Sequence, residues 1–155
     1  MKIFQYIPTA SFFLGGGEIV PLNQAIALAN EHHEVTLGIA RTNLKDKLLG
    51  SYDLSKINII EFDVLADHEG FVNSLENTHK EIHMIYLGLS RKVNEYLTEN
   101  KFDIVITHYP PANFCIPKST QLVFFLHGVP PNWDTIGDEA LRLADKIIAV
   151  SNSVG

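Results

Sequence analysis

The chain has 155 residues, a length that suits one domain of ordinary size, and 46% of them are hydrophobic, which argues against a disordered protein. The formal net charge is -6 and the lysines are scattered. This disfavours nucleic acid as a partner, because phosphate binding needs clustered Lys and Arg. The one cysteine, Cys115, excludes an internal disulfide and has no neighbour at the spacing of a metal site, so we predict no metal and no cofactor.

Neither a signal peptide nor a membrane span is predicted. The apolar run at the start of the chain ends at Pro8, too early for the core of a signal peptide. No apolar run approaches the roughly 18 residues of a membrane span. These features predict a cytoplasmic protein, and they leave contact with a membrane surface open.

The chain alternates predicted strands with predicted helices. Six short apolar runs predict strands, at residues 3–7, 34–40, 57–62, 103–107, 121–126 and 146–150. The first helix is predicted over residues 18–31, with Ile19, Leu22, Ile26 and Ala29 on one face and Pro21 in its first turn. The polar stretch 67–100 predicts a second helical region, amphipathic at least in its second half and divided near Gly70 or residues 77–78. A short helix is predicted at residues 139–144.

This alternation predicts an α/β fold. The sheet is expected to be doubly wound and mainly parallel, with helices on both faces, because its strands are continuous apolar runs. The whole chain, residues 1–155, is predicted to be a single Rossmann-like domain. If the strands take the common order 3-2-1-4-5-6, the first and fourth are neighbours where the order reverses, which is where such sheets bind ligands.

Several unusual residues follow the predicted strands. The first strand leads to Gly15, Gly16 and Gly17, then to acidic Glu18 at a helix start. Glycines let a backbone approach a ligand, and a helix N-terminus offers free N–H groups to a phosphate. The alternative is a loop that merely reverses the chain. A dinucleotide site is disfavoured, because there is no G-x-G-x-x-G pattern and the second strand ends in Ala40-Arg41 instead of an acidic residue.

Two histidines also follow buried strands. His127, before Gly128, could bind a sugar or a phosphate or transfer a proton, or it could only hydrogen-bond its own loop. The same two readings apply to His108, which is followed by Tyr109. The only tryptophan, Trp133, could stack on a sugar or anchor its loop.

Taken in order, five pieces of the sequence resemble the N-terminal domain of the retaining GT-B glycosyltransferases of group 1, or family 4. They are the short strand with its Gly15-Gly16-Gly17-Glu18 loop, the helix running into His33-Glu34-Val35, Phe102-Asp103-Ile104-Val105 with His108, His127-Gly128, and Ala144-Asp145-Lys146-Ile147-Ile148-Ala149-Val150-Ser151 with Val154. The resemblance covers nearly the whole chain. It implies one half of a GT-B fold and an enzyme that transfers a sugar from a nucleotide-sugar to an acceptor hydroxyl.

The resemblance also implies roles for residues. His127 would be catalytic, and the glycines 15, 16, 17 and 128 would face the donor phosphate and sugar. His108, Tyr109 and Trp133 would contact the acceptor. The donor's nucleotide would bind a second, C-terminal domain in the same protein, usually with an E-x7-E motif. Glu61 and Glu69 have that spacing here, but their predicted strand and loop setting indicates coincidence.

Two other functions stay open from the sequence. One is a non-catalytic module that binds a sugar or a nucleotide, or a subunit that completes a split transferase. The other is an unrelated Rossmann-like enzyme, because a fold does not determine a function. If the chain is one half of a GT-B glycosyltransferase, as the resemblance implies, it is expected to be inactive on its own.

Overall fold

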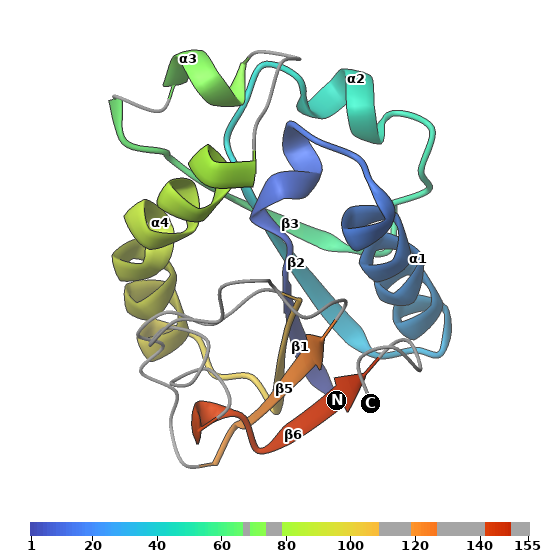
Figure 1. Ribbon diagram of the computed structural model, residues 1–155. Coiled ribbons are helices and arrows are strands. Elements are labelled where there is room, and N and C mark those ends of the chain that lie inside the picture. Colours follow the sequence, from blue (N-terminus) through green and yellow to red (C-terminus); the bar gives the residue numbers. More distant parts are fainter. Residues whose placement is uncertain (67–68, 74–78, 109–118, 127–141, 150–155) are drawn as a thin grey trace.

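The computed structural model describes residues 1–66, 69–73, 79–108, 119–126 and 142–149. In this part of the chain, six strands form one sheet in the order β3-β2-β1-β4-β5-β6 (Figure 1). The strands are β1 (Lys2–Tyr6), β2 (Glu34–Ala40), β3 (Asn58–Phe62), β4 (Ile104–Thr107), β5 (Gln121–Leu126) and β6 (Lys146–Ala149). Every pairing is parallel. The predicted α/β class and the order that places β1 beside β4 are therefore confirmed.

The helices cover both faces of this sheet. α1 (Gly16–Asn30) and α4 (His79–Glu99) lie on opposite sides of it (Figure 1). Three short elements follow the carboxyl ends of the first three strands: a 3-10 turn η1 (Pro8–Ser11), α2 (Lys45–Leu49) and α3 (Glu69–Val72). Gly70 lies inside α3, so the predicted break there is wrong, and the other predicted break, at residues 77–78, lies outside the described residues. Of the helix predicted at 139–144, residues 139–141 lie outside the described residues, and residues 142–143 are helical.

α1 begins earlier than predicted, and this rotates its buried face. Glu18, the third residue of the helix, is buried at 2% exposure, whereas Ile19 is 38% exposed. The buried positions after Glu18 include Leu22, Ala25 and Ala29, so the predicted placement of Ile19 in the core is wrong. Pro21 is also not in the first turn but sixth in the helix, where its missing N–H leaves the Gly17 carbonyl without its usual bond.

The opposite face of the sheet carries an aromatic core. The ring of Phe4 lies 5.5 Å from that of Tyr96 on α4 and 5.3 Å from that of Phe102, between ring centroids. Gly38 on β2 makes room for these rings, because a Cβ added there would lie 2.6 Å from the Phe4 side chain. Leu89 and Val93 of α4 are fully buried against the same core, as the predicted amphipathic pattern requires.

Candidate functional site

A buried carboxylate holds the glycine loop at the start of α1. Glu18 Oε2 accepts a hydrogen bond from the Gly15 backbone N–H at 2.9 Å, and Glu18 Oε1 accepts one from the Thr9 hydroxyl at 2.8 Å. Thr9 lies in η1 and is also fully buried. The only acidic side chain of the first turn is thus turned inward and held by two donors. Its charge does not occupy the space in front of the helix.

The other two glycines of the loop are open to their surroundings. A Cβ added at Gly16 or Gly17 would meet no heavy atom within 4 Å, whereas one at Gly15 would lie 2.9 Å from the Phe13 ring. No described glycine has a positive φ angle, so space and not backbone angle is what glycine provides here. The N–H groups of Gly16 and Gly17 are the first of the helix, which have no intrahelical acceptor. Of the three glycines, Gly16 and Gly17 are therefore the two whose backbone N–H groups a ligand can approach.

His108 is buried at 5% exposure at the end of β4. Its Nε2 lies 3.1 Å from Nε2 of Gln5, and its ring stacks on Phe125 with centroids 5.0 Å apart. The Gln5 amide nitrogen also donates to the Pro21 carbonyl at 3.0 Å and to Gln24 Oε1 at 2.8 Å. The amide carries two hydrogens for three neighbours, so the contact with Nε2 positions the His108 ring without assigning its tautomer. An acceptor-binding role for His108 stays a prediction, and the geometry places its ring beneath α1.

The remaining predicted site residues are not described by the structure. His127 and Gly128 follow β5 in the sequence, and Tyr109 follows His108. Trp133 and Cys115 also lie outside the described residues. The roles predicted for His127, Gly128, Tyr109 and Trp133 therefore stay predictions.

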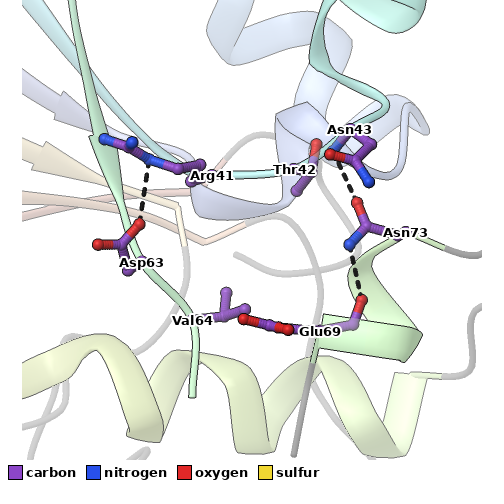
Figure 2. A pocket seen from close by; sticks show the side chains of 7 residues that line it. All are labelled: Arg41, Thr42, Asn43, Asp63, Val64, Glu69 and Asn73. Atoms are coloured by element: carbon purple, nitrogen blue, oxygen red, sulfur yellow. Dashed lines mark hydrogen bonds and ion pairs between the residues drawn. The ribbon is translucent and has the colours of Figure 1, made fainter. Parts of the chain in front are cut away.

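A polar pocket of about 280 Å³ opens where β2 and β3 end (Figure 2). Three segments line it: the residues after β2, the residues after β3, and α3. The lining residues are Arg41, Thr42, Asn43, Asp63, Val64, Glu69 and Asn73. Because the pocket lies at the carboxyl edge of a parallel sheet, it occupies the usual ligand side of this fold.

The walls of the pocket are tied together by short contacts. Arg41 Nε pairs with Asp63 Oδ1 at 3.0 Å, which joins the end of β2 to the end of β3. The Asn73 side chain accepts from the Asn43 backbone N–H at 2.6 Å and donates to the Glu69 carbonyl at 2.8 Å (Figure 2). The two hydrogen bonds of Asn73 hold α3 against the loop after β2. A ligand would therefore enter a pocket that is already formed.

The pocket and the glycine loop share η1 as a support. The Thr42 hydroxyl donates to the Ser11 carbonyl at 2.6 Å, and the Ser11 hydroxyl donates to the Ala40 carbonyl at 2.6 Å. Two residues earlier, Thr9 of the same turn holds Glu18 at the start of α1. One short turn thus fixes the position of both features.

Comparison with known families decides the class of the protein. The model of Glycosyltransferase Family 4 matches residues 14–155. The chain belongs to this family. Among curated protein sequences, none matches the chain significantly.

Solved structures show the same fold for this Family 4 domain. UGT89C1 of Arabidopsis thaliana complexed with UDP-L-rhamnose matches 97% of the chain at a TM-score of 0.67 and 14% identity. MurG of Acinetobacter baumannii matches 99% at 0.57 and 15% identity, and the lipopolysaccharide outer core galactosyltransferase WaaB in its apo form matches 99% at 0.57 and 19%. The chain spans 45%, 42% and 40% of these three proteins, respectively. It therefore has the architecture of one half of a GT-B glycosyltransferase.

Within the described residues, no three His, Cys, Asp or Glu side chains gather as a metal site would need. The helices in the same part of the chain include none with the length and apolar character to cross a membrane.

The sequence alone indicates only part of the pocket. Arg41, Thr42, Asn43 and Asp63 directly follow predicted strands, but no motif gives them a role. Glu69 and Asn73 belong to the predicted polar helical region, and only the folded chain brings them to the edge of the sheet. The Glu69 of the accidental E-x7-E spacing lines this pocket, while Glu61 lies in β3, with Oε2 3.4 Å from Lys45 Nζ.

Proposed function

We propose that this chain is the acceptor-side domain of a glycosyltransferase that moves a sugar from a nucleotide-sugar to an acceptor hydroxyl. Family membership supports the sugar transfer. The observation that carries the finer assignment is the open start of α1, where Gly16 and Gly17 leave space in front of unpaired backbone N–H groups. This is where the diphosphate of the donor would lie.

Charge favours a diphosphate at the start of α1. The N-terminus of a helix carries a partial positive charge, which stabilises an anion that its first N–H groups can reach. In a sugar transfer the nucleoside diphosphate is the leaving group, so negative charge grows on it as its bond to the sugar breaks. Donors already aimed at that charge lower the barrier. Glu18 would oppose the anion if it faced outward, and its bonds to Thr9 and Gly15 hold it inward.

The other half of the reaction needs a second domain. The base and ribose of the donor would bind there, and the reaction would take place between the two halves. Because catalysis depends on orienting both substrates, this chain alone should not transfer sugar. His127 is the proposed catalytic group, with Gly128 leaving room beside it, and His108, Tyr109 and Trp133 are proposed to face the acceptor.

The test is transfer of labelled sugar by a protein that combines this domain with a donor-binding half, whether in one chain or as a separate subunit. Gly16→Val should lower kcat and raise KM for the donor, because its side chain fills the space the diphosphate needs. The control is Ala27→Val, which places the same valine side chain at an exposed position on the same helix. Unchanged transfer by a folded Gly16→Val protein, with an unchanged thermal midpoint, would disprove the assignment.

A further inference from the structure

We propose that the pocket at the ends of β2 and β3 is the acceptor site and that it takes an uncharged, polyhydroxylated group about the size of one sugar ring. The inference rests on the proposed function and adds the location and the chemical class of the acceptor.

The pocket lies on the same edge as the glycine loop and is supported by the same turn. Thr42 at the pocket is bonded to Ser11 of η1, and Thr9 of η1 is bonded to Glu18 beneath the glycines. An acceptor in the pocket and a diphosphate at α1 would therefore lie at two features that the same 3-10 turn supports. A transfer needs its two substrates held in fixed positions relative to each other, which a shared support provides.

The charges of the lining disfavour an anionic ligand. One arginine, Arg41, is set against two carboxylates, Asp63 and Glu69, and Arg41 Nε is already paired with Asp63. A phosphate in the pocket would meet the uncompensated charge of Glu69. Hydroxyl groups, in contrast, can donate to carboxylates and accept from a guanidinium or an amide. The lining is therefore suited to a ligand that carries many hydroxyl groups and no charge.

The open bonding groups of the lining point to the same class. Within the described residues, the Glu69 carboxylate and the Asn43 side-chain amide make no hydrogen bond or ion pair. Val64 adds one apolar wall, which suits the C–H face of a sugar ring. Ligand sites for drug-sized molecules measure roughly 300–1,000 Å³. At about 280 Å³, this pocket has room for about one ring of the acceptor.

The first test uses the chain itself, with backbone amide NMR signals as the readout. The probes are glucose, galactose, mannose, N-acetylglucosamine and myo-inositol, each compared at equal concentration with its phosphate ester. We expect at least one uncharged probe to shift the signals of Asn43 and Asn73, and its ester to bind more weakly. Stronger binding of the esters, or no shift by any uncharged probe, would overturn the proposal.

Variants of the lining residues distinguish specific binding in the pocket from nonspecific binding elsewhere on the surface. Asn43→Ala should weaken binding about three- to tenfold, the usual effect of one lost hydrogen bond. The matched control is Asn58→Ala, an exposed asparagine at the amino end of β3, which should leave binding unchanged. Glu69→Gln should keep the uncharged probe within about threefold and tighten binding of its ester, because it removes the repelling charge. Equal effects of Asn43→Ala and Asn58→Ala, or no change in ester binding by Glu69→Gln, would contradict the proposal.

A parallel titration with inorganic pyrophosphate distinguishes this proposal from the proposed function. If pyrophosphate shifts Gly16 and Gly17 but no sugar shifts the pocket, only the acceptor assignment fails. If a sugar shifts the pocket and pyrophosphate leaves the glycines unchanged, the pocket assignment stands and the donor assignment fails.

Discussion

Replacing Glu18 by alanine should remove the carboxylate that ties the start of α1 to η1. Two hydrogen bonds are lost, one from the Thr9 hydroxyl at 2.8 Å and one from the Gly15 N–H at 2.9 Å. Thr9 is fully buried, so its hydroxyl would be left without an acceptor and without water. The glycine loop would also lose the contact that fixes its position in front of the helix.

The expected cost follows from these contacts. A hydrogen bond to a charged group contributes about 1.5–3 kcal/mol, and a buried donor left unsatisfied costs about 1–3 kcal/mol. The bond from Gly15 is only partly buried, so water can replace part of it. We therefore expect Glu18→Ala to lower the free energy of unfolding by about 3 kcal/mol. Glu18→Gln keeps one oxygen acceptor and should cost about half as much.

Urea unfolding followed by circular dichroism measures this loss. The control is Asn23→Ala, an exposed position of the same helix, which should change stability by less than about 0.5 kcal/mol. Thr9→Val combined with Glu18→Ala should cost clearly less than the sum of the two single changes, because both remove the same bond. A loss below about 0.5 kcal/mol for Glu18→Ala, or strict additivity with Thr9→Val, would refute this account of the loop.

Three further outcomes are expected. Burial raises the pKa of Tyr6, so folding favours its neutral form. The free energy of unfolding should therefore stay constant below about pH 10 and fall above it, by up to about 1.4 kcal/mol per pH unit. Urea unfolding of Tyr6→Phe above that pH should show a smaller fall, and an identical fall would contradict the burial argument. Gln5→Leu should change the tautomer ratio of His108, read by nitrogen NMR, because it removes the amide that lies 3.1 Å from Nε2; an unchanged ratio would contradict a role of Gln5 in holding the ring. In an active two-domain protein, His127→Ala should lower kcat about 100-fold with little change in KM for the donor; a folded variant with near-normal turnover would leave His127 a structural residue.

Strands were easier to predict than helix starts. The runs 34–40 and 121–126 coincide with β2 and β5. In β5 the five residues after Gln121 are all apolar, as expected of a strand buried on both faces. The start of α1 was misplaced, because Gly15-Gly16-Gly17 reads as loop while Gly16 and Gly17 are helical in the fold. The bond between Glu18 and Gly15 that stabilises this start is local, but its burial depends on Thr9 in η1, a turn too short to give a periodic signal.

The candidate site also has features that the sequence predicts and features that it does not. The glycines and His108 could be placed at the ligand edge by counting strands, because parallel strands all end on one side. That His108 is buried against Gln5 could not be predicted, since the two residues are 103 positions apart in the sequence. The pocket likewise depends on Asn73 reaching Asn43 across the ends of two strands. Such contacts exist only once the sheet has formed.

The central claim is that the start of α1 receives the diphosphate of the donor, and a titration of the chain with inorganic pyrophosphate tests it most directly. The backbone amide signals of Gly16 and Gly17 should shift most. Half-saturation is expected at about 10 mM, which corresponds to a binding free energy of about -2.7 kcal/mol. Gly16→Val should abolish these shifts while Ala27→Val preserves them. Shifts centred elsewhere in the chain, or none at Gly16 and Gly17 at saturating pyrophosphate, would contradict the account.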